Sequence, residues 1–297
     1  FDQGEDLKLW KPENYGKKFY GPSTLRTGVE KSRNLMTVRI AQNLGIKKIA
    51  DFSKEINIYE NPEELLSLSL GSSETTLLKL TSAYSSFVNG GKLVNPKFID
   101  RIQDSEGNTI FNSESRQCEG CQQISYLSKK IPKIKNNFKQ IMSKETAYQM
   151  TSILEGTVKR GTAKGLKDLN LDLGGKTGTT NNNTDTWFVG FSSNYVIGVY
   201  VGYDEPSSLG KYETGSRTAM PIFKAFVKNA VKKENARPFK IPQGIKMLVV
   251  NSNTGERASY NDESIIIEAF KEKDLVNNKI QYGNLDYISK ENIYKFY

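Results

Sequence analysis

Apolar and polar positions in the first part of the chain follow a helical period. Between Gly21 and Gly45, apolar side chains recur at helical intervals, and a polar Ser-Arg-Asn run at 32–34 interrupts them as a loop between two helices does. Asn61 followed by Pro62 predicts another helix start, because Asn caps a helix and Pro fits its first turn. Three further helices are predicted, at 75–88, 143–158 and 219–232.

The pattern changes to alternation in the last third of the chain. Strands are predicted at 174–180, 186–192 and 195–204. The last two should form an antiparallel hairpin, because only a tight turn separates them. A final strand is predicted at 245–250, and beyond about residue 260 the pattern weakens into a Lys- and Asn-rich tail that we expect to be poorly ordered in part.

We expect one domain over residues 1–245 and a C-terminal strand, turn and tail over 246–297. Within the domain, residues 93–140 form an irregular lobe, because short strand-like pieces there stand among turn-rich, charged stretches.

The composition matters most through one number: the 297 residues include no histidine. This excludes imidazole as a general base, and with it the Ser-His-Asp and Cys-His mechanisms. The formal net charge of +9 could indicate an anionic partner such as nucleic acid. The basic residues are scattered rather than gathered in one motif, so background composition explains the charge better and no nucleic-acid partner is predicted.

We find no signal peptide and no membrane-spanning segment in these 297 residues. No stretch approaches the roughly 18 apolar residues of a membrane span. The sequence opens on Phe1 rather than Met and shows no signal peptide. We therefore expect a fragment, with any anchoring or exporting segment upstream of Phe1.

The segment most informative about chemistry is Gly-Gly-Lys-Thr-Gly-Thr-Thr at 174–180. On a strand, Lys176 gives a positive charge, Thr177 and Thr179 add hydroxyls, and Gly178 lets a substrate lie against bare backbone. An edge strand of this kind can pair with an extended peptide and aim an N–H at a developing oxyanion. A Lys-Thr-Gly triplet alone is a weak signal, but the flanking residues and the following hairpin favour a functional site.

Ser32 and Asn34 supply a second element. By themselves they are better explained as part of an exposed junction between helices. Together with Lys176 they offer a hydroxyl that can relay a proton and an amide that can hold a peptide carbonyl. A Ser/Lys pair is the natural base chemistry for a chain without histidine.

Ser-x-Asn followed by Lys-Thr-Gly-Thr-Thr on a strand resembles the pattern of penicillin-binding proteins and serine β-lactamases. The surroundings are similar to the transpeptidase domain of class A, bifunctional penicillin-binding proteins. The resemblance implies an α+β fold with an antiparallel sheet packed between helices plus an all-α subdomain. The matching blocks are residues 10–15, 21–26, 32–34, 70–74, 83–84, 89–91, 160–163, 175–180, 185–191 and 202–206.

The chain shows two of the three motifs that define this family. The third, Ser-x-x-Lys, holds the acylated serine and its lysine base, and in the family it lies several tens of residues before Ser-x-Asn. Only 31 residues precede Ser32, and none spell it. The one Ser-x-x-Lys in the chain begins at Ser208, in a predicted loop after Lys-Thr-Gly, where a nucleophile at a helix start is not expected. We therefore expect the nucleophile upstream of Phe1.

The resemblance implies a role for each matching residue. Ser32 would relay a proton between the leaving amine and the lysines, Asn34 would hold a side-chain amide of the donor stem peptide, and Lys176 would attract the terminal carboxylate and tune Ser32. Thr177 and Thr179 would hydrogen-bond the same carboxylate, and the N–H of Thr179 would form half of the oxyanion hole.

The activity implied is that of a serine-type D-Ala-D-Ala transpeptidase or carboxypeptidase in a bifunctional peptidoglycan synthase, with this fragment inactive by itself. The implied partners are peptidoglycan stem peptides, their lipid-linked precursor, β-lactam antibiotics and regulators of cell-wall synthesis. No cofactor and no metal site are expected. The domain would lie on the periplasmic side of the bacterial inner membrane, with the glycosyltransferase domain and the anchor upstream.

Two alternatives to the enzyme stay open: a penicillin-recognising regulatory module that no longer acylates, and a β-lactamase, which would leave the synthase-like blocks unexplained.

Cys118 and Cys121 also have several interpretations. A zinc site lacks further Cys or His ligands, and a redox motif lacks its usual context. For a periplasmic domain, a local disulfide is preferred over free thiols.

Overall fold

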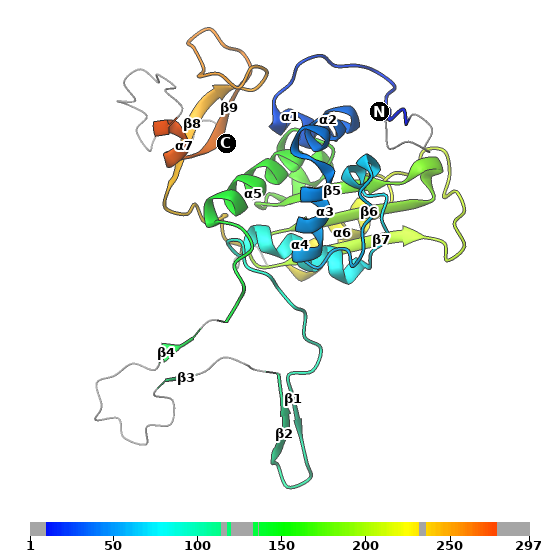
Figure 1. The fold of residues 1–297 in the computed structure, drawn as a ribbon, viewed down its shortest axis with the longest axis vertical. Coiled ribbons are helices and arrows are strands. Elements are labelled where there is room, and N and C mark those ends of the chain that lie inside the picture. The colour runs from blue at the N-terminus through cyan, green and yellow to red at the C-terminus, as the bar shows by residue number, and fades with distance from the viewer. Residues whose placement is uncertain (1–9, 114–117, 120–132, 136, 232–235, 278–297) are drawn as a thin grey trace.

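The computed structural model describes residues 10–113, 118–119, 133–135, 137–231 and 236–277. Figure 1 shows helices packed around one central sheet, with a thin arm projecting from one end and a separate hairpin at the other. In chain order the helices and strands are α1 (Leu25–Glu30), α2 (Asn34–Leu44), α3 (Ile46–Glu55), the 3-10 helix η1 (Leu66–Leu70), α4 (Leu77–Val88), β1 (Arg101–Gln103), β2 (Thr109–Asn112), β3 (Cys118–Glu119), β4 (Lys133–Ile134), α5 (Lys144–Lys159), the 3-10 helix η2 (Lys164–Leu169), β5 (Gly174–Thr179), the 3-10 helix η3 (Asn181–Asn183), β6 (Asp185–Phe191), β7 (Val196–Gly202), α6 (Ala219–Ala230), β8 (Ile245–Asn251), β9 (Ile265–Lys271) and α7 (Glu272–Asn277).

The central sheet has the order β5-β6-β7 and is antiparallel throughout. Lys176 of β5 lies opposite Val189 of β6, which lies opposite Gly198 of β7. Within the described part of the chain β5 pairs on one side only, so the strand with the Lys-Thr-Gly triplet is an edge strand. The three predicted strands and the antiparallel hairpin are confirmed.

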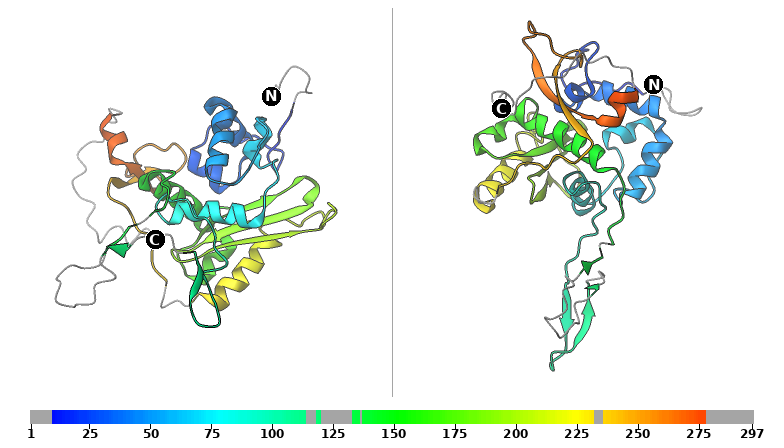
Figure 2. Two further views of the ribbon diagram at one scale, coloured as in Figure 1. Left: turned by 60° about the horizontal axis from the view of Figure 1, so that its bottom comes forward. Right: turned by 90° about the vertical axis from the view of Figure 1, so that its left-hand side faces the viewer.

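Helices cover both faces of this sheet, as the left view of Figure 2 shows for α4 and α6. On the α6 face, Phe188 and Phe223 are fully buried and meet edge to face, with ring centroids 4.9 Å apart. On the opposite face α4 approaches β7 so closely that a Cβ on Gly198 would come within 2.1 Å of the Thr81 hydroxyl oxygen. This α+β arrangement agrees with the predicted fold class.

The predicted break at residues 32–34 is confirmed, because α1 ends at Glu30 and α2 begins at Asn34. Thr24 caps α1, and its hydroxyl accepts a hydrogen bond from the N–H of Thr27. Gly45 ends α2 with a φ of 86°. The sequence pattern missed α3, which begins at the very next residue.

The helix predicted from Asn61 and Pro62 is wrong. The chain there is irregular up to the short helix η1, which begins at Leu66. Leu66 is buried against Val38 and Ala41 of α2. Leucines at alternate positions pack against neighbouring segments and stabilise this stretch. The Asn-Pro signal for a helix start is not followed by apolar residues at helical intervals, so it does not produce an α-helix against that packing.

The remaining predicted helices are confirmed, as α4, α5 and α6. The hydroxyl of Ser143 caps α5 and accepts from the N–H of Thr146 at 3.2 Å.

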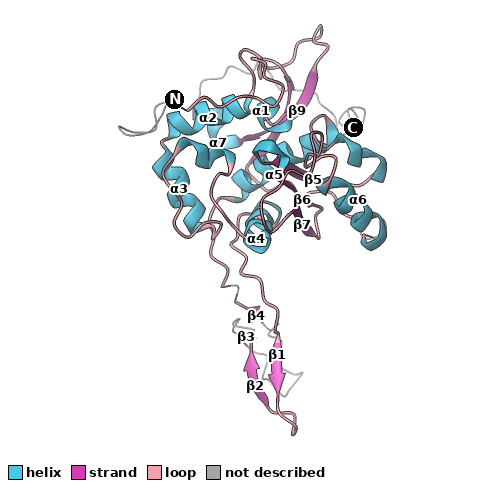
Figure 3. Ribbon diagram, turned by 90° about the vertical axis from the view of Figure 1, so that its right-hand side faces the viewer, coloured by secondary structure: helices cyan, strands magenta, loops and turns pink. Residues whose placement is uncertain are grey.

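The lobe at 93–140 is irregular where the structure describes it. Its longest strands, β1 and β2, form an antiparallel ribbon that projects away from the helices (Figure 3).

The strand at 245–250 is present as β8 but is not the last strand. It pairs along its whole length with β9, which the Lys- and Asn-rich composition after residue 260 had hidden. Contacts with α5 hold β9, since the side-chain amide of Gln149 donates to the carbonyl of Ala269 at 2.9 Å. The tail beyond residue 277 lies outside the described residues, and the domain boundary at 245 stays a prediction.

Among the described helices, none has the length and apolar character to cross a bilayer.

Candidate functional site

The structure brings together Ser32 and Lys176, which lie far apart in the sequence. The Nζ of Lys176 donates to the Ser32 Oγ at 2.6 Å and to the main-chain oxygen of Thr177 at 3.0 Å. Lys176 projects from the edge strand β5, and Ser32 lies between α1 and α2. The two motifs identified in the sequence therefore form one site.

Ser32 sits in a left-handed turn, with a φ of 53°, which is uncommon for a residue other than glycine. Its N–H donates to the carbonyl of Val29 at 3.1 Å, and the N–H of Arg33 donates to the carbonyl of Gly28 at 2.9 Å. Backbone conformations of this kind cost energy and persist where the surroundings hold them. The turn ends α1 and directs the serine hydroxyl to the lysine.

Burial lowers the pKa of Lys176 to about 8, from an ordinary value of 10.5. Close to neutral pH the side chain therefore exchanges between ammonium and amine more readily than an exposed lysine does. A lysine with such a pKa, bonded to a hydroxyl, can pass a proton in either direction.

The lowered pKa predicts how stability depends on pH. Between pH 8 and 10.5 the unfolded chain holds the Lys176 proton and the folded chain releases it, so the free energy of unfolding should rise with pH over this interval. Lys176→Met should remove that rise, because methionine does not titrate. Urea unfolding of both chains at several pH values measures the difference, and equal pH dependence in the two chains would count against a lowered Lys176 pKa.

Asn34 is the first residue of α2, and its side-chain amide donates to the carbonyl of Glu13 at 2.9 Å. Asn14, the residue after Glu13, has two bonds through its side-chain amide: its oxygen accepts from the N–H of Leu35 at 3.2 Å, and its nitrogen donates to the carbonyl of Lys18 at 2.7 Å. The segment before α1 is thus bonded to the start of α2, beside Ser32. The predicted contact of Asn34 with a substrate amide stays a prediction.

The hydroxyls on β5 have partners that the sequence analysis did not assign. Thr177 donates to the hydroxyl of Thr162 at 3.2 Å, and the hydroxyl of Thr179 accepts from the N–H of Gly215 at 3.0 Å. Gly215 lies so close to the strand that a Cβ on it would be 2.5 Å from the carbonyl oxygen of Gly178. Thr162 belongs to a block of the family resemblance, which was the one signal in the sequence that could have indicated it.

The Ser-x-x-Lys at 208–211 lies in an exposed loop, as predicted. The Ser208 hydroxyl accepts from the N–H of Gly210 at 3.2 Å, and the side-chain amide of Asn183 holds the carbonyls of Gly210 and Lys211, both at 2.9 Å. Ser208 is not at the start of a helix. Of the cysteines, Cys121 lies outside the described residues, so the disulfide with Cys118 stays a prediction.

Comparison with known proteins gives concordant results. The family model described as the penicillin-binding protein transpeptidase domain matches residues 1–228. Penicillin-binding protein 1A of Rickettsia conorii is 43% identical over 300 residues, covering 97% of this chain and 38% of the relative. The chain thus spans about two fifths of the length of such relatives.

Solved structures of similar proteins share the fold. Penicillin-binding protein 1A from Haemophilus influenzae has a TM-score of 0.76 and 27% identity, covering 91% of this chain and 43% of that structure. The PonA1 protein of Mycobacterium tuberculosis, solved in complex with penicillin V, has a TM-score of 0.60 and 20% identity, covering 77% of this chain and 62% of its own. The second likeness concerns the fold alone.

Proposed function

This chain belongs to the penicillin-binding protein transpeptidase family, and from that premise we propose that it cross-links peptidoglycan as part of a class A synthase. The reaction is the transfer of a stem peptide from its terminal D-Ala to an amine of a neighbouring strand. Hydrolysis of the same intermediate gives carboxypeptidase activity. The observation that carries the proposal is the 2.6 Å hydrogen bond from Lys176 to Ser32, which joins two of the family's motifs.

The proposed reaction uses these residues to move a proton and hold charge. A serine Oγ gives its proton to the lysine of its own Ser-x-x-Lys motif and attacks the carbonyl carbon of the penultimate D-Ala, and the C–N bond to the terminal D-Ala breaks. The leaving amine takes a proton through Ser32, whose hydroxyl Lys176 holds in place. An acceptor amine then attacks the acyl-enzyme, the ester C–O bond to the serine breaks, and the proton of the amine returns by the same route to the serine oxygen.

Residues of β5 and of the start of α2 are proposed to position the substrate. The terminal carboxylate accepts from the hydroxyl of Thr179 and from that of Thr177, whose proton turns from Thr162 to the substrate, and it faces the charge of Lys176 when that residue is protonated. The N–H of Thr179 donates to the developing oxyanion. Asn34 binds a stem-peptide amide.

The attacking serine is proposed to come from a Ser-x-x-Lys motif outside these 297 residues, because the motif at Ser208 lies in an exposed loop. β-Lactams are proposed as inhibitors that acylate the same serine, which the penicillin V complex of PonA1 supports by analogy of fold. The proposed location is the periplasmic side of the bacterial inner membrane, where the stem peptides, their lipid-linked precursor and any regulators of the synthase would meet this domain.

A fluorescent penicillin tests this proposal. The complete gene product should be labelled covalently, and labelling should stop when unlabelled benzylpenicillin is added first. The 297-residue chain by itself should remain unlabelled, because it lacks the attacking serine. Absence of labelling in the complete gene product would contradict the proposed activity, and labelling of Ser208 in the shorter chain would contradict the assignment of the motifs.

A further inference from the structure

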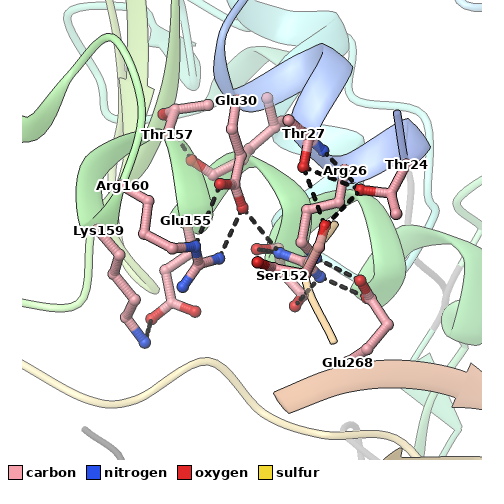
Figure 4. A network of polar contacts seen from close by, with 12 residues as sticks. Thr24, Arg26, Thr27, Glu30, Ser152, Glu155, Thr157, Lys159, Arg160 and Glu268 are labelled. Carbon is pink, nitrogen blue, oxygen red and sulfur yellow. Dashed lines mark hydrogen bonds and ion pairs between the residues drawn. The ribbon is translucent and has the colours of Figure 1, made fainter. Parts of the chain in front are cut away.

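A cluster of four charged side chains lies beside the site: Arg26, Glu30, Arg160 and Glu268, here called the Arg26 cluster. Figure 4 shows Glu30 between the two arginines, with Glu268 beyond Arg26. The side chains of Arg26 and Glu30 are only 4% and 5% exposed. Two positive and two negative charges balance, as buried ion pairs require.

Glu30 is held from two sides. Its Oε1 accepts from Arg160 Nη2 at 2.6 Å and its Oε2 from Arg160 Nε at 3.2 Å, in the two-pronged geometry that suits a carboxylate. Arg26 adds a longer contact, with Nη1 3.4 Å from Glu30 Oε1, and Arg26 Nη2 donates to Glu268 Oε1 at 2.5 Å. The hydroxyl of Ser152 in α5 completes the surroundings of Arg26 at 2.9 Å.

Backbone hydrogen bonds of Glu30 connect the Arg26 cluster to the site. Its carbonyl accepts from the N–H of Thr162 at 3.1 Å, and the hydroxyl of Thr162 accepts from Thr177 of β5 at 3.2 Å. The next residue, Lys31, donates its Nζ to the carbonyl of Arg160. Glu30 therefore ties the last turn of α1, which leads directly into Ser32, to the strand that carries the lysine.

Two glycines make room for Glu30. A Cβ on Gly156, inside α5, would lie 1.8 Å from Glu30 Oε1, and a Cβ on Gly161 would lie 2.3 Å from the Glu30 carbonyl oxygen. Glycine inside a helix is unfavourable relative to alanine. Its presence at residue 156 is explained by the close approach of the carboxylate, which indicates that the position of Glu30 is specified by α5 as well as by its ion pairs.

We propose that Glu30 is a positioning residue for acylation: held by Arg26 and Arg160, it fixes the turn that presents Ser32 to Lys176. The catalytic consequence rests on the function proposed above, whereas the structural part does not. Glutamine at position 30 would leave two arginines beside the turn without the charge between them, and with only one side-chain oxygen left, one of the two side-chain N–H groups of Arg160 that now bind Glu30 would lose its acceptor.

Glu30→Gln tests the proposal on the 297-residue chain by NMR titration of isotope-labelled lysine. Loosening of the turn admits water to Lys176, so its pKa should move up from about 8 toward the ordinary 10.5. In the complete gene product, the acylation step with penicillin should slow by about 10- to 100-fold, as for a misplaced catalytic group, with little change in the initial binding of the drug.

Glu268→Gln is the matched control, because it removes a carboxylate from the other end of the same cluster. It should lower stability, yet leave the Lys176 pKa and the acylation step unchanged. A folded Glu30→Gln chain in which Lys176 still titrates near 8, or an equal shift in Glu268→Gln, would overturn the proposal.

If Glu30→Gln does not fold, Glu30→Asp decides the matter. It keeps the charge but withdraws the carboxylate from Arg160, so the Lys176 pKa should again rise, and an unchanged pKa overturns the proposal. The titration needs no substrate. Failure of the complete gene product to react with penicillin would therefore contradict the proposed function and leave the positioning result standing.

Discussion

Lys176→Ala in the complete gene product should slow acylation by penicillin by about 10²- to 10⁴-fold, the range over which a positioned proton-transfer group contributes. Alanine removes the hydrogen bond to Ser32 and the positive charge on β5 in one step. The second-order rate constant, from time courses of fluorescent penicillin labelling, measures the effect.

Lys211→Ala is a suitable control, because Lys211 is an exposed lysine in the loop after β7. Its rate constant should equal that of the unaltered protein. An undiminished rate in Lys176→Ala would contradict the role given to this residue.

Ser32→Ala adds a test of whether the two groups act together. Residues that work as a unit are strongly non-additive, so the double variant Ser32→Ala/Lys176→Ala should be little slower than Lys176→Ala alone. Rate losses that multiply would indicate two independent contributions and would argue against a shared proton path through the 2.6 Å hydrogen bond.

Phe223→Ala should lower the free energy of unfolding by about 3–5 kcal/mol, the usual cost of truncating a buried phenylalanine. Phe223 is fully buried between α6 and the sheet, where it contacts Phe188 edge to face. The cavity left behind would lie directly under the strands that carry the site. Urea unfolding, followed by circular dichroism, measures the change.

Phe226→Ala on the same helix is the control, because this residue is 51% exposed. It should cost less than about 1 kcal/mol, since little apolar surface is lost from the core. Equal losses for the two substitutions would show that α6 does not pack on the sheet as described.

Local sequence signals predicted the elements that depend on neighbouring residues. The hairpin of β6 and β7 follows from alternation around a tight turn, and the break at residues 32–34 follows from three polar residues inside a helical pattern. The pairing of Ser32 with Lys176 did not follow from periodicity. It was implied by the family resemblance, and the structure brings the two side chains together.

What the sequence could not predict depends on contacts between distant segments. Strand β9 is stabilised by its pairing with β8 and by α5, and the run Ile265-Ile266-Ile267 does not alternate. No role for Glu30 was predicted from the sequence, because the arginine that holds it most closely lies 130 residues away. No local pattern indicates such a partner.

The central claim is that β5 and the start of α2 form the substrate-binding half of a transpeptidase site. A crystal structure of the complete gene product acylated by penicillin tests it most directly. The drug's carboxylate should lie within hydrogen-bond distance of the hydroxyls of Thr177 and Thr179, and its side-chain amide should contact Asn34. A drug molecule bound without contact to any of these residues would contradict the claim.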